Sequence, residues 1–441
     1  MEGWCTLGEF NVFKQGPDDF VVMGVDGMRM EVDREAAAVT LAMHGNTRAD
    51  AARMLKPILG RRALRCIDEM AAEFAELNFI EYKPEPATPS YNYERALANL
   101  DEVPRGPLTL QELDVTLGSA CPMSCGYCWR DDQKLNLKLD WDDCLHMLDD
   151  AQRLACRVLN ISGGEPSAFW RLVADTAREA MARGICEVSV NTTGFNLQDR
   201  QLQAWREAGI FCINYSFDTL DAERNDDVYQ MKGAWRRTVD SIRAAQKYGF
   251  LIHLNTTIYG ENASELEDMA AFAKSVDNCV LRVNPYVPMG KSQRVSPVVF
   301  ADVERRMQAL RASGHRIYSP LDANERFTNF LVCSAGITRV IVEHDGTVGG
   351  CLFLGGRYAA RGTVREPGLF RLWTEGDWSF FREEFHEIPS LCQDCRLRFA
   401  CVGSCYAHAL GLTGDAKHRD AEGTFTCPYK IAEKEAELVG A

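Results

Sequence analysis

Three cysteines lie close together in the stretch Cys121-Pro122-Met123-Ser124-Cys125-Gly126-Tyr127-Cys128, and no further cysteine follows until Cys144. Thiolates at these spacings can hold three corners of a cubane 4Fe–4S cluster, although most such clusters take four cysteines. A cluster with three protein ligands leaves one iron open. Because an open iron can bind and transform a small molecule, the stretch predicts chemistry rather than simple electron storage.

The composition indicates a soluble chain with several domains. Its 441 residues, 46% of them hydrophobic, suffice for two or three domains with their own cores. No apolar run approaches a membrane span, and Met1-Glu2-Gly3-Trp4 does not begin a signal peptide. The net charge of −14 argues against nucleic acid as main partner, because phosphate binding requires clustered lysine and arginine. We therefore expect a cytoplasmic protein with no nucleic-acid or membrane partner.

The chain has 17 cysteines, which is many for a cytosolic protein, and they are unevenly spread. Seven lie between Cys333 and Cys427, counting both ends, and seven more are scattered outside the two clusters. A secreted disulfide scaffold would be short and would carry a signal peptide, which excludes that class. Scattered free cysteines mostly behave as small buried hydrophobes, whereas the clustered ones indicate metal ligands.

Residues 1–83 are predicted to form a small separate domain. Strand-like runs at 12–15 and 20–32, the second with a turn at 25–28, come first, and a strand at 79–82 closes the region. Between them, helical patterns lie at 35–44, 47–56 and 61–77. Asn46 or Thr47 is the predicted N-cap of the second helix, and Pro57 its end. This order resembles a winged helix. A DNA-binding role is the plain alternative, but no basic recognition face is present.

A linker is predicted over residues 84–107, which contain the prolines at 84, 86, 89, 104 and 107. From there the pattern changes to strands that alternate with helices. Apolar strand-like runs lie at 110–117, 158–162, 186–190, 211–216, 251–257 and 280–286. Amphipathic segments lie between them at 141–153, 170–182, 199–208, 234–247 and 263–275.

Six such units predict an α/β fold, a partial (β/α)6 TIM-like barrel over residues 108–291. The cysteine stretch follows the first strand at its carboxyl end, where barrel active sites lie. The alternation is predicted to stop after Lys291, so residues 292–441 form a third, cysteine-rich and loop-rich domain.

A second motif, Ser162-Gly163-Gly164-Glu165-Pro166, ends the second predicted strand. Two glycines let the backbone approach a ligand closely, and Glu165 can pair with an ammonium group. Such a string on its own could equally be a simple turn. Its position after a strand, downstream of the three cysteines, favours a ligand site.

Together the two motifs resemble the radical S-adenosyl-L-methionine (SAM) superfamily. The resemblance implies that Cys121, Cys125 and Cys128 hold a 4Fe–4S cluster whose open iron chelates the amino and carboxylate groups of SAM. The reduced cluster then cleaves SAM to methionine and a 5′-deoxyadenosyl radical, which abstracts hydrogen from a substrate. A zinc knuckle or buried thiols are the alternative, but zinc would require a fourth nearby cysteine or histidine.

The resemblance also implies the residues that contact SAM. Gly163, Gly164, Glu165 and Pro166 would meet the amino group, and Tyr127 would lie near the adenine. Ser216 and Asn191, at the ends of the fourth and third strands, match further SAM-facing positions, although each could be an ordinary strand-end turn. Where relatives carry an arginine after the fourth strand, this chain has Gln230 or its neighbour. Lys232, Arg236 or Arg237 could replace it, so the partner of the SAM carboxylate stays unassigned.

The later cysteines resemble the seven-cysteine SPASM extension of peptide-modifying radical SAM enzymes. This resemblance implies two auxiliary 4Fe–4S clusters, three clusters in all. The outer cluster would be held by Cys392, Cys395, Cys401 and Cys427, and the inner one by Cys333, Cys351 and Cys405. A zinc-ribbon arrangement is the alternative, since Cys-x2-Cys pairs also bind zinc.

Two departures from this pattern stand out. Some relatives have a further inner-cluster cysteine six residues before Cys333, where this chain has Phe327. Either another group supplies the ligand or one iron is open. Sulfatase-maturing relatives carry an aspartate directly after the cysteine that matches Cys351, where this chain has Leu352, which weakens that interpretation.

The N-terminal domain is similar to the PqqD-like domains that hold the leader of a ribosomally synthesised precursor peptide, in which the leader adds as an extra strand. A purely structural cap is the alternative. We therefore predict a maturase that abstracts hydrogen from a peptide residue, leading to a cross-link or oxidation, with flavodoxin or ferredoxin as electron donor. A SPASM enzyme acting on a protein side chain or a tetrapyrrole-like small molecule, and a plain iron–sulfur carrier, are the competing hypotheses.

Overall fold

The computed structural model describes residues 3–7, 10–14, 16–24, 29–77, 79–84, 91–103, 108–128, 130, 135–287, 297–319, 334–359, 361–382 and 405–416. Several sequence predictions fall outside these described residues. They are the turn at 25–28, Phe327, and the cysteines Cys333, Cys392, Cys395, Cys401 and Cys427.

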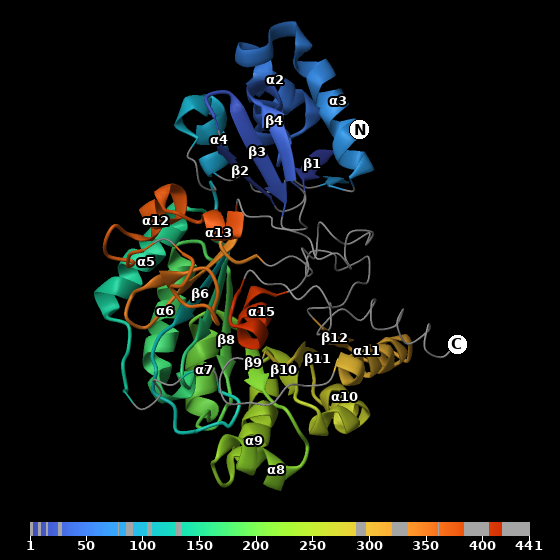
Figure 1. The fold of residues 1–441 in the computed structure, drawn as a ribbon, viewed down its shortest axis with the longest axis vertical. Coiled ribbons are helices and arrows are strands. Elements are labelled where there is room, and N and C mark those ends of the chain that lie inside the picture. The colour runs from blue at the N-terminus through green and yellow to red at the C-terminus, as the bar shows by residue number, and fades with distance from the viewer. Residues whose placement is uncertain are drawn as a thin grey trace.

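The N-terminal part combines two small sheets with a group of helices (Figure 1). β1 (Trp4–Leu7) pairs antiparallel with β5 (Ile80–Lys83), and the second sheet has the order β2 (Phe10–Lys14), β3 (Asp19–Gly24), β4 (Arg29–Asp33). Helices follow as α1 (Arg34–Met43), α2 (Arg48–Leu59), the short 3-10 helix η1 (Gly60–Arg62) and α3 (Ala63–Glu76). The predicted order of elements is confirmed, and β1 is a strand that the sequence analysis missed.

The helix starts follow from capping side chains. The Asp33 carboxylate accepts a hydrogen bond from the Ala36 amide at 2.8 Å, and the Thr47 hydroxyl accepts one from the Asp50 amide at 3.2 Å. The predicted end of α2 at Pro57 is wrong, because the helix continues to Leu59. Pro57 lies in the last turn, where its ring removes a single backbone hydrogen bond, and Leu59 is buried in the domain core.

Residues 84–107 contain a helix that the linker prediction did not include. It is α4 (Tyr91–Ala98), followed by η2 (Leu100–Glu102). Tyr93, Leu97 and Leu100 are buried in the same core as α1, α2 and α3, and the Tyr93 hydroxyl donates to the carbonyl of Phe10. This segment therefore packs onto the N-terminal part.

A nine-stranded sheet forms the centre of the molecule, with the order β12-β11-β10-β9-β8-β7-β6-β13-β14 (Figure 1). The six predicted barrel strands are present as β6 (Glu112–Thr116), β7 (Val158–Ser162), β8 (Glu187–Thr192), β9 (Ile210–Ser216), β10 (Leu251–Ile258) and β11 (Cys279–Pro285). All are parallel to their neighbours, so the predicted partial TIM-like barrel is confirmed.

The helices that cover the barrel match the predicted amphipathic segments closely. They are α5 (Trp141–Arg153), α6 (Trp170–Ala182), α7 (Asp199–Glu207), α9 (Ala234–Gln246) and α10 (Leu266–Lys274), with η3 (Pro166–Phe169) and η4 (Glu261–Glu265) leading into two of them. Every second strand residue, such as Leu113, Ile161 and Val190, is fully buried in the core shared with these helices. The sequence analysis missed α8 (Ala222–Tyr229).

The predicted stop of the alternation after Lys291 is wrong. α11 (Pro297–Ala312) and β12 (Ile317–Tyr318) follow, and β12 pairs in parallel with β11. Helix α11 has no strong apolar face, so the sequence of this region does not show a helical pattern.

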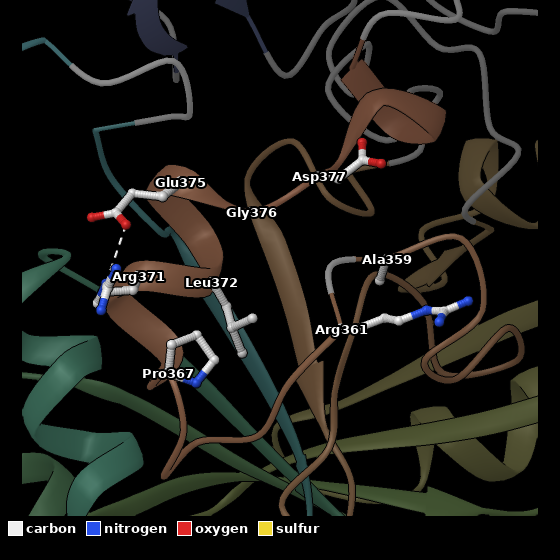
Figure 2. Close-up of a pocket in the computed structure, with 8 residues that line it drawn as sticks. All are labelled: Ala359, Arg361, Pro367, Arg371, Leu372, Glu375, Gly376 and Asp377. Atoms are coloured by element: carbon white, nitrogen blue, oxygen red, sulfur yellow. Dashed lines mark hydrogen bonds and ion pairs between the residues drawn. The ribbon is translucent and has the colours of Figure 1, made fainter.

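The C-terminal part joins the other edge of the sheet. β13 (Arg339–Val342) pairs in parallel with β6 and antiparallel with β14 (Val348–Gly349). Its helices are α12 (Leu369–Glu375), α13 (Ser379–Arg382) and α15 (Tyr406–Thr413). Beside α12 lies a pocket of about 430 Å³ with an Arg371–Glu375 ion pair at its edge (Figure 2), lined by Ala359, Arg361, Pro367, Arg371, Leu372, Glu375, Gly376 and Asp377.

A fully buried amide connects the three parts. The Asn11 side chain, on β2, accepts hydrogen bonds from the amide and hydroxyl of Thr109 at 2.9 and 2.8 Å and donates to the Ile337 carbonyl at 3.2 Å. Trp373 of α12 donates its indole N–H to the Thr109 carbonyl at 3.0 Å. No helix in the described ranges has the length and apolar character needed to cross a bilayer.

Candidate active site

The cysteine stretch lies at the carboxyl end of β6 and is fastened to α8. The Ser124 amide donates to the Tyr229 carbonyl at 3.2 Å, and the Gly126 amide donates to the Val228 carbonyl at 3.1 Å. Met123 is buried with Tyr229, and Cys121, Cys125 and Tyr127 pack against that group. The helix that the sequence analysis missed thus supports the stretch from one side.

The Gly-Gly-Glu-Pro turn at the end of β7 contacts residues 118–120, which lead directly into the cysteine stretch. The Gly164 amide donates to the Gly118 carbonyl at 2.7 Å, and the Glu165 amide donates to the Ala120 carbonyl at 2.8 Å. A Cβ atom on Gly164 would lie 2.1 Å from the Ser119 carbonyl oxygen, closer than any non-bonded contact allows. Only glycine fits at this position, so the close backbone approach expected of the motif is observed.

Glu165 is fully buried and organises the end of β8. Its carboxylate accepts hydrogen bonds from the Ser167 amide at 2.9 Å, the Thr193 amide at 2.8 Å, the Thr193 hydroxyl at 2.6 Å and the Thr192 hydroxyl. These four donors occupy the acceptor sites that a carboxylate offers. In this structure Glu165 is therefore a positioning residue that ties the turn to Thr192 and Thr193, and its predicted contact with the SAM ammonium stays a prediction.

Tyr127 is held by Asp218, to which the sequence analysis gave no role. The Tyr127 hydroxyl donates to one Asp218 oxygen, and the Thr257 amide donates to the other at 2.7 Å. Burial raises the pKa of Asp218 to about 6, while the hydrogen bonds from Tyr127 and Thr257 oppose that rise. The Tyr127 ring stacks on Tyr259 at a centroid distance of 6.2 Å.

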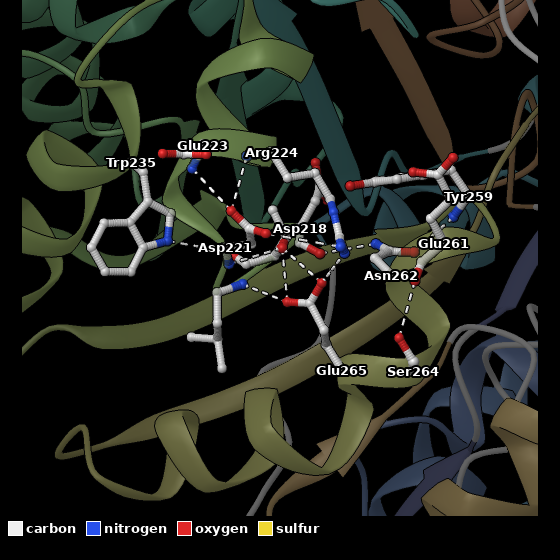
Figure 3. A network of polar contacts seen from close by, with 12 residues as sticks. Asp218, Asp221, Glu223, Arg224, Trp235, Tyr259, Glu261, Asn262, Ser264 and Glu265 are labelled. Carbon is white, nitrogen blue, oxygen red and sulfur yellow. Dashed lines mark hydrogen bonds and ion pairs between the residues drawn. The ribbon is translucent and has the colours of Figure 1, made fainter.

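A polar network keeps these residues in place beneath the site (Figure 3). Asn262 donates to the carbonyls of Asp218 and Thr257 at 2.9 and 2.8 Å. Glu265 accepts from the Thr219 hydroxyl at 2.7 Å, from the Leu220 amide at 2.8 Å, and from Arg224. The segment after β9, helix α8 and the segment after β10 are thereby linked.

The chemistry of the cysteines fits a cationic iron centre. Burial raises the pKa of Cys121 to about 11 and raises that of Cys125 further, where repulsion from Cys128 and Cys121 adds to it. Thiolates at these positions therefore require positive charge to stabilise them, which bound iron supplies. Among the described residues no three His, Cys, Asp or Glu side chains converge on a single metal ion. The ligands of a cubane bind three different irons and need no such convergence.

Polar atoms without partners face the same end of the barrel. Among the described residues, the Thr116 hydroxyl on β6, the side-chain carbonyl oxygen of Asn255 on β10 and the Tyr259 hydroxyl are buried and have no hydrogen-bond partner. Buried polar groups are normally paired, so these three atoms indicate a polar ligand at this place. The residues present therefore fit a cluster in the cysteine stretch with a polar molecule beside it.

The remaining predicted contacts lie around this region. Pro166 is buried and begins η3, while Asn191 on β8 and Ser216 at the end of β9 are partly buried. Ser216 is the register neighbour of Asn255, and its carbonyl accepts from the Tyr229 hydroxyl at 3.1 Å. Arg236, a candidate for the SAM carboxylate, is exposed and pairs with Asp240 at 3.2 Å, so it faces solvent.

Two of the seven predicted auxiliary ligands are described. Cys351 directly follows β14 and the turn at Gly350, and Cys405 precedes α15, each partly buried. An ion pair of 3.2 Å between Arg130 and Glu343 links the cysteine stretch to the β13–β14 hairpin, with side chains that are 6% and 15% exposed. Leu352 follows Cys351 where an aspartate base would be expected.

Comparison with known proteins decides the family of the barrel. Residues 115–273 match the family model of the Radical SAM superfamily. These residues form a radical SAM domain. The match includes the cysteine stretch, the Gly-Gly-Glu-Pro turn, Asp218 and Tyr259.

The similarity to known proteins extends beyond the radical SAM domain. The AdoMet-dependent heme synthase of Methanosarcina barkeri is 25% identical over 329 residues, covering 68% of this chain and 92% of that protein. Mycofactocin maturase MftC of Mycolicibacterium smegmatis is 24% identical over 306 residues, covering 65% of this chain and 76% of that protein. Streptococcus suis SuiB bound to its precursor peptide SuiA has a TM-score of 0.65 at 15% identity, covering 94% of this chain and 99% of that one. At this identity the structural similarity shows the fold alone.

The sequence analysis missed the residues that position the site. Asp218, Thr192 and Thr193 lie one or two residues after the predicted contacts Ser216 and Asn191, but their partners lie 25 or more residues away along the chain. A short polar side chain directly after a buried strand was the available signal for each of them.

Proposed function

We propose that the chain is a radical SAM maturase that abstracts hydrogen from a residue of a ribosomally synthesised precursor peptide, leading to a cross-link or an oxidation. The observation that carries the proposal is the contact, at the strand ends, between the Gly-Gly-Glu-Pro turn and residues 118–120, which lead directly into the cysteine stretch. Gly164 has no room for a side chain there, and partnerless polar atoms lie at the same end of the barrel.

Each residue has a definite task in this proposal. Cys121, Cys125 and Cys128 would hold the 4Fe–4S cluster, which when reduced supplies the electron that cleaves SAM to methionine and a 5′-deoxyadenosyl radical. Gly163 and Gly164 let the backbone approach SAM, and Glu165 keeps the neighbouring strand end in place. Tyr127, whose hydroxyl is hydrogen-bonded to Asp218, would line the adenine side of the SAM site together with Tyr259.

The auxiliary part completes the oxidation. Abstraction of one hydrogen atom leaves a substrate radical, and loss of a proton and one further electron forms the new bond. Two auxiliary 4Fe–4S clusters, held by the seven cysteines of the C-terminal part, would accept that electron. A flavodoxin or ferredoxin of the cytoplasm would reduce the radical SAM cluster. The leader of the peptide would bind to the N-terminal part.

The relatives support a peptide substrate. MftC is named as a maturase, and the SuiB structure holds a precursor peptide. Co-expression with each short open reading frame beside the gene tests the proposal by mass spectrometry. One peptide is expected to lose the mass of two hydrogen atoms in the presence of the wild-type chain and to stay unmodified with the Cys125→Ala variant. Unmodified peptides throughout would contradict a role in peptide maturation.

A tetrapyrrole-like substrate is the second candidate, because the heme synthase of Methanosarcina barkeri is covered over 92% of its length. Incubation of the reconstituted chain with SAM, dithionite and iron-coproporphyrin distinguishes the two. A mass change of the porphyrin would favour this candidate over the peptide.

A further inference from the structure

The inner face of the barrel is polar, which is unusual for this architecture. The interior of a TIM-type barrel is normally filled by branched apolar side chains. Here five adjacent strands each place a polar residue on the inner face, at a position that alternates with the buried apolar ones. These residues are Asp114, Asn160, Ser189, Asn214 and His253.

These five side chains form one continuous hydrogen-bonded row across the sheet. Asn160 donates to Asp114 at 2.9 Å and accepts from the Ser189 hydroxyl at 2.6 Å. Asn214 donates to that hydroxyl at 3.3 Å, and its carbonyl oxygen lies 2.9 Å from Nδ1 of His253. Hydrogen bonds of this kind hold the five side chains in fixed positions relative to one another.

Opposite charges balance at one end of the row. Arg339 on β13 lies 3.7 Å from the Glu112 carboxylate and 3.8 Å from the Asp114 carboxylate. Burial raises the pKa of Asp114 to about 6, with Arg339 opposing the rise. The positive charge of Arg282, at the other end of the row, also opposes the rise, although it forms no ion pair with Asp114.

The other end carries an arginine without an anionic partner. Arg282 lies in the middle of β11, between the buried Leu281 and Val283. In the described part of the chain it forms no ion pair, and its Nε is buried without a hydrogen-bond partner. Its neighbours are the Tyr318 ring, whose centroid is 5.7 Å from Cζ, and His253, whose pKa is lowered to about 4 by burial and by Arg282 and Arg316.

Arg282 is partly exposed, but its Nε is buried without an acceptor, and an N–H that has lost its water without gaining a partner lowers stability. Such a cost is typical of residues kept for function. Arg282 is also close to the radical site, since it is the register neighbour of Asn255, which in turn neighbours Ser216. Two strand spacings, about 10 Å, therefore separate the backbones of Arg282 and Ser216.

We propose that Arg282 binds a carboxylate of the substrate and so holds the reacting residue over the polar row, beside SAM. The proposal rests on the function proposed above. Guanidinium and carboxylate form paired hydrogen bonds, and neither the Tyr318 ring nor the neutral His253 offers Arg282 a negative charge at this end. The carboxylate belongs to an acidic side chain or to the C-terminus of the peptide.

The test uses three fragments of nearly equal shape with the full, reconstituted chain in the presence of SAM. N-acetylglutamate α-amide offers a side-chain carboxylate, N-acetylglutamine offers an α-carboxylate, and N-acetylglutamine α-amide offers none. In ligand-observed NMR titrations, one acidic fragment is expected to bind about tenfold more tightly than the neutral one. The fragment that gains identifies the source of the carboxylate.

Variants assign the preference to Arg282. The preference should disappear in Arg282→Gln, survive in part in Arg282→Lys, and stay unchanged in the matched control Arg236→Gln, whose guanidinium is on the surface. The Arg282→Gln variant should have a thermal midpoint no lower than that of the wild type and should keep its affinity for SAM. The proposal would be overturned if Arg282→Gln still bound the acidic fragment more tightly than the neutral one. It would also be overturned if the variant lost affinity for SAM instead of the preference for the acidic fragment.

Failure of the proposed function gives a different result. Release of 5′-deoxyadenosine with dithionite and SAM alone should be equal in the wild type and Arg282→Gln. If neither releases it, the radical SAM function fails, whatever the fragments show. If both release it and the acidic fragments have no preference, only the role of Arg282 fails.

Discussion

A Gly164→Ala variant is expected to lose at least about 100-fold of SAM-cleavage activity, because small displacements of a reacting centre have effects of this size. The added Cβ would lie 2.1 Å from the Ser119 carbonyl oxygen and 2.3 Å from that of Ala120. Both atoms are backbone, so neither can rotate away. The turn and the cysteine stretch must separate, and with them the cluster and the SAM-facing residues. Initial rates of 5′-deoxyadenosine release measure the loss.

Gly126→Ala provides the matched control for this prediction. Gly126 lies between Cys125 and Cys128, and a Cβ atom at this position meets no atom within 4 Å. The control is expected to keep its activity within about twofold, since exposed substitutions away from contacts have small effects. Equal activities of the two variants would show that the contact between turn and stretch is not needed.

A Glu165→Gln variant is expected to lower the free energy of unfolding by about 2 kcal/mol, the size expected for a buried donor left without an acceptor. The carboxylate accepts the amide N–H of Ser167 on one oxygen and that of Thr193 on the other. In either orientation, the amide group of glutamine would direct an N–H against one of these backbone donors. Chemical denaturation of the two full-length chains measures the difference.

The same variant is expected to weaken SAM binding about tenfold or more, because a charged hydrogen-bond network at the binding end of the barrel is lost. Equilibrium binding of SAM to the reconstituted chains measures this. The control is Glu179→Gln, which removes a partly exposed carboxylate that pairs with Arg183 on the barrel exterior. A Glu165→Gln chain with unchanged stability would show that the four hydrogen bonds contribute nothing.

The periodicity of apolar residues and the spacing of the strand-like runs were sufficient to predict the barrel. Each strand is a short apolar run next to a helix with a clear apolar face, so the bounds of α5 and α6 agree with the prediction at both ends. The elements that were missed had weaker local signals. α8 has only three apolar residues, Ala222, Val228 and Tyr229, which are too few to show a helical period. α4 and η2 together place only four residues in the core at helical spacing, Tyr93, Ala96, Leu97 and Leu100, which is a short signal.

The candidate site was predictable where the chemistry requires one kind of residue. Cysteine ligands and glycines at a close backbone approach are such cases, and Gly164 is the observed example. Residues that act by position, such as Asp218 toward Tyr127, were not, because their role depends on a partner brought close only by folding. Arg282 looks like an ordinary charged strand residue until the sheet places it on the inner face, where it forms no ion pair with any described residue.

The central claim is that this chain cleaves SAM reductively at the cluster held by Cys121, Cys125 and Cys128. The most direct test reconstitutes the full chain without oxygen, adds SAM and dithionite, and quantifies 5′-deoxyadenosine and methionine. The account predicts equal amounts of both products from the wild type and none from a Cys125→Ala variant that keeps its fold. A wild-type chain that carries its iron and sulfide yet releases no 5′-deoxyadenosine would contradict it.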